Sequence, residues 1–224
     1  MDDEKLYWLA FSAFNGVGPK RFALLKNYFG SAKKAWEAGE KELLEIGLGP
    51  KLTSGLLEFR NDFDPSSYFL RLRENEIECY FLDDNNYPEN LKKIDNPPFI
   101  LYVKGTISPE DELAIAVVGT RKMTGYGGQV TESLVTELVG AKMTIVSGLA
   151  RGVDSMAHKA ALRADGRTIG VLACGLILFI RQKMFLWLRK LLMDMEPLFL
   201  NFLWGCSQCP GVFRLAIELF LVWL

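Results

Sequence analysis

The sequence predicts an α/β protein in which a small all-helical domain precedes a parallel sheet. Between residues 6 and 60, apolar residues recur at helical spacing, as in Leu6, Leu9 and Ala13. After residue 113, short apolar runs alternate with glycine-bearing loops and with segments of helical length. After residue 176 the composition changes abruptly. We therefore divide the chain into a helical domain (1–62), a connecting region with the first strands (63–112), a core (113–176) and a tail (177–224).

Two short breaks interrupt the helical domain, at Gly16–Pro19 and at Gly47–Pro50. Lys20 and Arg21 follow the first break, and Lys51 follows the second. This arrangement resembles a helix-hairpin-helix turn, in which glycines let backbone N–H groups approach a phosphate. The same residues also fit ordinary helix ends, with glycine closing one helix and proline opening the next. The sequence leaves both interpretations open.

The connecting region contains the first predicted strands. Apolar runs at 79–82 and 99–103 are typical of short strands. Turn-forming residues gather at 83–88 and 96–98. We therefore expect two strands before the core begins.

The core repeats a strand–loop–helix pattern. The run Ala114–Val118 consists of small and β-branched residues, which is typical of a strand covered on both faces. A polar loop that contains glycines follows this run, then a helix, and the pattern begins again. The predicted strands are 114–118, 143–146 and 168–172, the loops 119–127 and 147–152, and the helices 128–140 and 154–164. This alternation predicts a right-handed, parallel sheet of the Rossmann type.

The two loops of the core are candidates for anion binding. Both leave the carboxyl ends of neighbouring strands and lead into helix N-termini, whose free N–H groups suit phosphate. Each loop carries one guanidinium, of Arg121 or Arg151, that can hold a phosphate with two hydrogen bonds. Further candidates are the hydroxyls of Thr120, Thr124 and Ser147 and the ring of Tyr126, which can stack on a base.

Asp154 and His158 lie one turn apart on the helix after the second loop. We expect Asp154 to cap that helix rather than to act in catalysis. In a purely structural alternative for the two loops, Arg151 pairs with Asp154 and the glycines serve tight turns. We expect His158 to pack or to support other groups, because no Ser or Cys nucleophile stands in a recognisable elbow. The loops match neither the dinucleotide-binding glycine motif nor the Walker motif. The sequence therefore predicts neither enzyme activity nor a cofactor.

Charge and composition exclude other classes of protein. With 26 basic and 27 acidic residues the net charge is -1, which excludes a globally basic protein but allows a local basic patch. The acidic start, Asp2 to Glu4, has the wrong charge for a signal peptide, and charges interrupt every apolar window of the tail. We therefore expect a cytoplasmic protein without a membrane span. Cys206 and Cys209 form a single C-x-x-C pair, from which we expect no metal site.

The motifs of the core resemble those of the DprA/Smf family of bacterial DNA-processing proteins. They are Val117–Arg121, Tyr126–Gly127, Ser147–Asp154 and Ala157–His158. The resemblance covers roughly residues 6–176 and implies a SAM-like helical domain followed by an extended Rossmann fold. It also implies binding of single-stranded DNA, loading of a RecA-type recombinase in natural transformation, and a homodimer. The candidate DNA-binding residues are Gly119, Thr120, Arg121, Lys122, Thr124, Tyr126, Gly127, Ser147, Gly148, Arg151 and Gly152.

The tail departs from this family. Of its 48 residues 32 are apolar, yet they keep neither a helical period nor a strand alternation. A shifted reading frame permits the family-like strings D-I-V-Y-P-P-E-N from Leu176, S-E-F-P-L-G before Gly205 and P-A-R-N-R-I-I-S-G-L after Cys209. We therefore predict that one nucleotide was lost near codon 176, which truncates the sheet and makes the product poorly stable.

Two other functions are compatible with parts of the sequence. A nucleotide phosphoribohydrolase of the lysine-decarboxylase-like group would share the strand–loop–helix phosphate site. Its P-G-G-x-G-T-x-x-E motif is absent from the sequence. The other alternative is an inactive product of a disabled gene.

Overall fold

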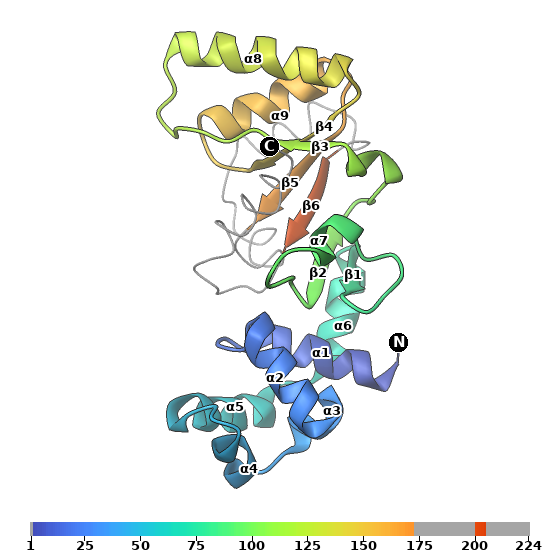
Figure 1. The fold of residues 1–224 in the computed structure, drawn as a ribbon, viewed down its shortest axis with the longest axis vertical. Helices are drawn as coiled ribbons and strands as arrows, with labels where there is room; N and C mark the ends of the chain where they lie inside the picture. Colours follow the sequence, from blue (N-terminus) through green and yellow to red (C-terminus); the bar gives the residue numbers. More distant parts are fainter. Residues whose placement is uncertain (1, 173–199, 205–224) are drawn as a thin grey trace. The chain divides into compact units, whose positions relative to one another are not determined.

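The computed structural model describes residues 2–172 and 200–204. The chain forms two compact units, of which the first is Met1–Leu101 and the second runs from Tyr102 to Trp204. Most of the helices belong to the first unit, and the second contains most of a sheet together with two further α-helices (Figure 1).

The first unit is mostly helical. Its helices are α1 (Asp3–Ala13), α2 (Pro19–Phe29), α3 (Ala32–Glu37), α4 (Glu40–Glu45), α5 (Pro50–Asp62), α6 (Pro65–Glu74) and the short α7 (Glu89–Lys92). Proline opens α2, α5 and α6, at a position where its missing N–H would have no helical partner. Gly18 and Gly49 are the N-caps of α2 and α5. Both breaks predicted from the sequence are therefore helix ends, and phosphate binding there stays a prediction.

Aromatic side chains form much of the core of the first unit. Trp8 of α1 and Phe22 of α2 are buried and meet edge to face, with ring centroids 4.7 Å apart. Phe22 also stacks on Phe99 at 4.0 Å, and Phe11 meets Trp36 of α3 edge to face at 5.1 Å. Each such pair adds about 0.5–1.5 kcal/mol beyond the area it buries. These rings hold helices that are individually too short to be stable alone.

Two strands follow the helices of this unit. β1 (Ile77–Phe81) comes after α6, and β2 (Ile100–Lys104) begins at the end of the unit. Both strands were predicted, one or two residues away from their observed positions. Between them, the buried hydroxyl of Tyr87 donates a hydrogen bond to the Pro98 carbonyl at 2.7 Å, and burial raises the pKa of Tyr87.

The second unit is built on a sheet with the strand order β2-β6-β5-β4-β3. Its further strands are β3 (Ala114–Ala116), β4 (Thr144–Gly148), β5 (Thr168–Leu172) and β6 (Leu200–Trp204), and a 3-10 turn, η1 (Pro109–Glu112), precedes β3. Neighbouring strands from β3 to β6 run parallel, whereas β2 and β6 are antiparallel. The predicted Rossmann-type parallel sheet is confirmed, with one antiparallel pair added to it.

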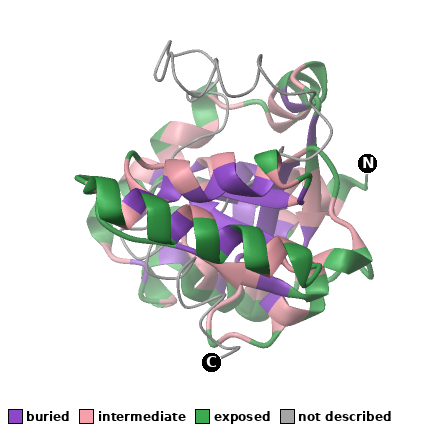
Figure 2. Cartoon of the chain, turned by 90° about the horizontal axis from the view of Figure 1, so that it is seen from above, coloured by how far each residue is buried: buried purple, intermediate pink, exposed green. Residues whose placement is uncertain are grey.

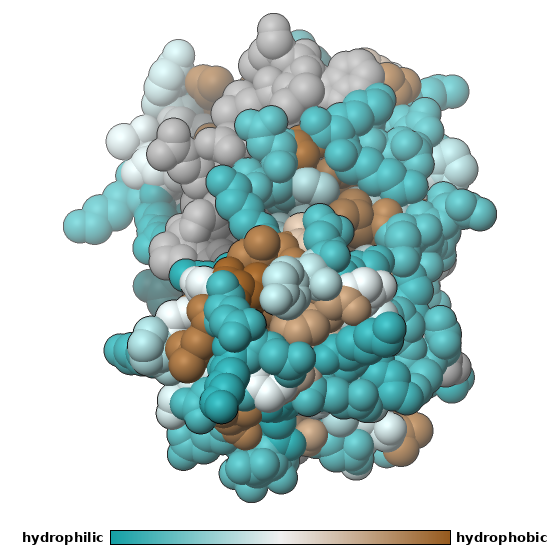
Figure 3. Space-filling model, turned by 60° about the horizontal axis from the view of Figure 1, so that its bottom comes forward, coloured by the Kyte–Doolittle hydropathy of each residue, from teal (hydrophilic) through white to brown (hydrophobic). Residues whose placement is uncertain are grey.

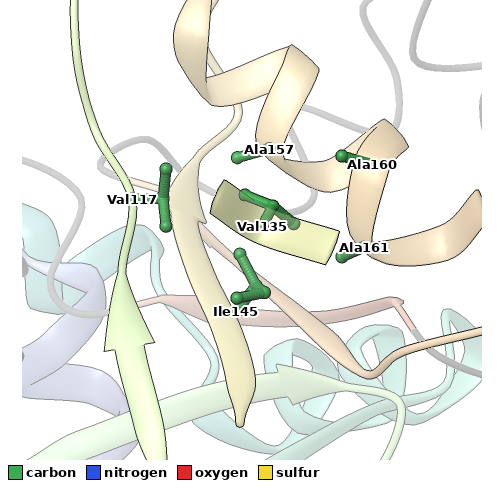
Figure 4. Close-up of a cluster of buried hydrophobic side chains, with 6 residues drawn as sticks. All are labelled: Val117, Val135, Ile145, Ala157, Ala160 and Ala161. Carbon is green, nitrogen blue, oxygen red and sulfur yellow. The ribbon is translucent and has the colours of Figure 1, made fainter. Parts of the chain in front are cut away.

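Helices α8 (Gly125–Gly140) and α9 (Val153–Arg163) pack against each other and against β4 (Figure 1). Between them and the strands lies a cluster of buried side chains, Val117, Val135, Ile145, Ala157, Ala160 and Ala161 (Figure 4). All contributions of α9 to this cluster are alanines, whose small side chains let the helix backbone approach the sheet. Figure 2 shows the buried residues beneath the helices and exposed residues on the outward face of α8.

Two elements of the core differ in length from their predictions. β3 ends at Ala116 although the apolar run continues to Val118, which is 42% exposed. α8 begins at Gly125, three residues before the predicted start at 128. Thr124 accounts for the early start, because its hydroxyl accepts the N–H of Gly127 at 3.1 Å and caps the helix.

One segment of the tail is a strand, which corrects the expectation that the tail has no strand. Residues 200–204 form β6, which pairs with β5 on one side and β2 on the other. A strand that lies between two others forms backbone hydrogen bonds with both. Such a strand can therefore form without an alternation of apolar and polar residues in its own sequence. The remainder of the tail lies outside the described residues, and the predicted loss of a nucleotide stays a prediction.

Hydrophilic side chains dominate the face shown in Figure 3, and apolar side chains form smaller patches on it. In the second unit, the exposed apolar side chains include Tyr126, Val130 and Leu134 of α8. None of the helices within residues 2–172 is long and apolar enough to cross a bilayer.

Candidate nucleic-acid interface

The parallel pairing of β3 and β4 brings two loops to the same edge of the sheet. Ala114 pairs with Thr144 and Ala116 with Val146, so the two strands end side by side. The β3 loop, residues 117–124, leads into α8, and the β4 loop, residues 149–152, leads into α9. In a parallel sheet this edge is where ligands bind, because loops and helix N-termini gather there.

The two loops touch through their backbones. The N–H of Val153 donates to the carbonyl of Thr120 at 3.2 Å. Gly152 has φ +86°, and a Cβ at this position would lie 2.1 Å from the same carbonyl oxygen. A Cβ at Gly119 would in turn lie 2.8 Å from Cγ2 of Val153. Both predicted glycines are therefore required for close backbone packing, whatever further role they have.

Asp154 connects the two loops from below. Its side chain is 2% exposed, and Oδ1 accepts the N–H of Gly119 in the β3 loop at 3.4 Å. The carboxylate also interacts with the N–H groups of Ala150 and of Asp154 itself. Burial raises the pKa of Asp154, while these N–H donors and the nearby Arg121 act in the opposite direction.

The expected N-cap role of Asp154 is therefore corrected. The N-cap of α9 is Gly152, and Asp154 lies in the first turn of the helix. Its carboxylate hydrogen-bonds to backbone in both loops instead of closing one helix end. The prediction that Asp154 lies near the start of a helix was correct. Its hydrogen bond to Gly119, 35 positions away in the sequence, could not be predicted from local pattern.

The cationic candidates lie on the surface. Arg121 and Lys122 of the β3 loop and Arg151 of the β4 loop are exposed. The ring of Tyr126, in the first turn of α8, is 76% exposed. No ion pair joins Arg151 to Asp154 or to another residue within 2–172, so the alternative in which these two residues pair is not observed. Three cations from two adjacent loops and one aromatic ring from the first turn of α8 thus form a set that suits phosphates and bases.

The hydroxyl candidates have partners within the loops. The hydroxyl oxygen of Thr120 accepts the N–H of Lys122 at 3.1 Å, and that of Thr124 caps α8. Ser147 is 2% exposed, and its hydroxyl donates to the carbonyl of Val117 at 2.6 Å. Gly148, the last residue of β4, is also buried. These groups hold the loops in shape, and Ser147 and Gly148 do not reach the surface that carries the cations.

His158 lies inside the second unit, beneath the β4 loop. Its side chain is fully buried, and Nδ1 lies 2.8 Å from the hydroxyl oxygen of Thr168. Because Thr168 donates its own proton to the carbonyl of Ile145, it can accept one from His158. Burial lowers the pKa of His158 to about 4, so the ring is neutral at pH 7. The packing interpretation of His158 is confirmed, and Cys206 and Cys209 lie outside the described residues.

Comparison with known proteins agrees with this architecture. Residues 78–194 match the family model of DNA recombination-mediator protein A. Protein Smf of Synechocystis is 36% identical over 180 residues, which cover 78% of this chain and 45% of that protein. DNA processing protein DprA of Bacillus subtilis is 43% identical over 104 residues, which cover 46% of this chain and 35% of that protein. The chain thus spans less than half the length of these two relatives.

Two solved structures are similar in fold. The crystal structure of DprA from Streptococcus pneumoniae superposes with a TM-score of 0.66 at 25% identity, covering 93% of this chain and 71% of that one. The second is DprA from Helicobacter pylori, whose structure was reported for its mode of single-stranded DNA binding. It superposes with a TM-score of 0.50 at 25% identity, covering 65% of this chain and 64% of that one. The family match continues to residue 194, beyond the predicted break at 176. The chain therefore belongs to the DNA recombination-mediator protein A family, DprA/Smf.

Proposed function

We propose that this chain binds single-stranded DNA on the surface formed by the β3 loop, the β4 loop and the first turn of α8. The observation that supports this most strongly is the convergence of three exposed cations and one exposed aromatic ring on two adjacent loops. Arg121 and Lys122 come from one loop, Arg151 from the other, and Tyr126 from the helix start.

Each of these side chains has a role in holding a single strand. Guanidinium groups bind phosphate with two parallel hydrogen bonds, and the lysine ammonium acts as a point charge. An exposed tyrosine ring stacks on any base, which suits binding without sequence preference. Since the loops are fixed to each other by Gly152 and Asp154, the cations are held at a defined separation. The role we propose is binding rather than catalysis, because His158 is buried and Asp154 is engaged by backbone groups.

The family supports a place for this binding in DNA processing. The relatives from Bacillus subtilis and Streptococcus pneumoniae are named for DNA processing, and the Helicobacter pylori structure concerns single-stranded DNA. We extend the proposal to protection of incoming DNA and loading of a RecA-type recombinase during natural transformation, by a homodimer of the intact protein. The resemblance of the core motifs to the family supports the proposed protection of DNA, the loading of a recombinase and the homodimer.

Replacing Arg121 by Ala tests the proposed surface. Loss of one phosphate contact is expected to weaken binding of labelled oligo(dT) about tenfold or more, because charge-assisted hydrogen bonds contribute about 1.5–3 kcal/mol. The slope of log K against log salt should also fall by about 0.7. Fluorescence anisotropy titrations at several salt concentrations measure both quantities.

Arg163→Ala is the matched control for this substitution. It removes a cation whose side chain is 64% exposed at the end of α9, away from both loops. We expect it to change the affinity less than twofold. Equal losses for the two variants would mean that DNA is attracted by overall charge, and unchanged binding in Arg121→Ala would contradict the proposed surface.

A further inference from the structure

The carboxylate of Asp154 occupies a position that a phosphate usually takes in a sheet of this type. It lies in the first turn of α9 at the carboxyl edge of the sheet, and it accepts N–H groups from both loops. Helix N-termini at this edge are the usual phosphate sites, because several free N–H groups point in one direction. In this chain the carboxylate of Asp154 already accepts the N–H groups of Gly119, of Ala150 and of Asp154 itself at this edge, so the anion there belongs to the protein.

Burial makes this occupation a strong constraint. Asp154 is 2% exposed, so its carboxylate is withdrawn from the surface and hydrogen-bonds to backbone N–H groups. A second anion at the same donors would meet a buried negative charge within a few ångströms. The N–H of Val153, at the start of α9, is also engaged, because it donates to the carbonyl of Thr120. The exposed cations, Arg121 and Arg151, are then the groups that remain for phosphate.

We infer that Asp154 is a specificity-determining residue, which excludes the phosphate of a mononucleotide from the backbone N–H groups of the two loops and leaves phosphate recognition to the loop side chains. Side-chain cations spread over two loops suit a continuous sugar–phosphate backbone, whereas a single cradle of amides suits one terminal phosphate. The consequence for DNA rests on the proposed function. The exclusion itself is a property of the protein alone and can be measured without DNA.

Removing the carboxylate should create a phosphate site. In Asp154→Ala, the N–H groups of Gly119 and Ala150 lose their acceptor and face the space that the carboxylate occupied. Inorganic phosphate should then stabilise this variant and raise its Tm by about 3 °C or more, because a ligand that binds only the folded state shifts unfolding. dTMP should act like phosphate, and thymidine should have no effect. The experiment is thermal unfolding of the full chain in phosphate and in chloride at equal ionic strength.

Two reference proteins isolate the effect of Asp154. The unaltered chain and Glu137→Ala, which removes an exposed acidic residue of α8, should show only the small stabilisation that phosphate gives to any protein. An equal phosphate effect in all three proteins would overturn the inference. Asp154→Ser is a second variant, which keeps one acceptor oxygen and leaves room for an anion.

The outcome is informative even if the variants are unstable. A variant that refolds in phosphate but not in chloride supports the inference, and one that stays unfolded in both contradicts it. Failure of the proposed function has a different result, since oligo(dT) would then not bind while phosphate still rescued Asp154→Ala. Binding of oligo(dT) without any phosphate effect would overturn the role of Asp154 alone.

Discussion

Gly152→Ala is expected to destabilise the second unit by about 2–4 kcal/mol and to abolish tight binding of oligo(dT). The residue has φ +86° and ψ −130°, a region that side chains with a Cβ rarely adopt. The new methyl group would lie 2.1 Å from the Thr120 carbonyl oxygen and 2.9 Å from Cα of Arg121. Since both neighbours are backbone atoms, the β3 loop must move and carry Arg121 with it. Urea unfolding and the anisotropy titration measure the two effects.

Gly140→Ala serves as the control for this loss. Gly140 is the last residue of α8, has ordinary helical geometry, and a Cβ there meets nothing within 4 Å. We expect a change of less than about 1 kcal/mol, in the stabilising direction. If Gly152→Ala behaved like this control, the close contact between the two loops would not exist as described.

Asp111→Ala is expected to cost about 3–5 kcal/mol, because it leaves a mostly buried arginine without its partner. Arg167 Nη2 donates to Oδ2 of Asp111 at 2.7 Å, and Nε donates to Oδ1. The two side chains are only 13% and 9% exposed. Thr144 also donates to Oδ1 of Asp111, at 3.1 Å, so this ion pair joins η1 to β4 and β5. Equilibrium unfolding in urea measures the loss.

The double variant Asp111→Leu with Arg167→Met replaces both charged side chains by apolar ones. It therefore distinguishes the stability of the ion pair from the cost of leaving one buried charge unpaired. It should cost less than Asp111→Ala alone, because no uncompensated charge remains. Glu132→Ala is the surface control, since the Arg163–Glu132 pair is 64% and 44% exposed, and it should change stability by less than about 1 kcal/mol. Equal effects of Asp111→Ala and Glu132→Ala would show that the Asp111–Arg167 pair does not stabilise the sheet.

Local pattern was sufficient to predict the order of the strands and long helices between residues 114 and 172, but it missed α6 in the predicted connecting region. β5 was predicted at its observed bounds and α9 to within one residue, because short apolar runs and helical spacing are local properties. The start of α8 was missed, since Gly125 and Gly127 are poor helix formers and only the Thr124 cap reveals the first turn. β6 was missed because its neighbours in the sheet, rather than its own sequence, make it a strand.

In the candidate site, too, features that depend on local sequence were predicted and contacts between distant residues were not. Exposure of Arg121, Arg151 and Tyr126 agrees with their selection as ligand-binding candidates, because loops after parallel strands lie at the surface. Ser147 was selected as a ligand-binding candidate and Asp154 as a helix cap, yet both are bound to backbone groups 30 and 35 positions away. Sequence periodicity contains no information about such pairs.

We propose that the two loops bind a continuous single strand of DNA in preference to a nucleotide or a duplex. The most direct measurement is competition: the unaltered chain, with labelled oligo(dT) bound, is challenged with unlabelled oligo(dT), with a duplex of equal length and with dTMP. We predict that the single strand displaces the label at the lowest concentration, because only its bases are free to stack on Tyr126. Displacement by dTMP at an equal phosphate concentration, or by the duplex as readily as by the single strand, would contradict the account.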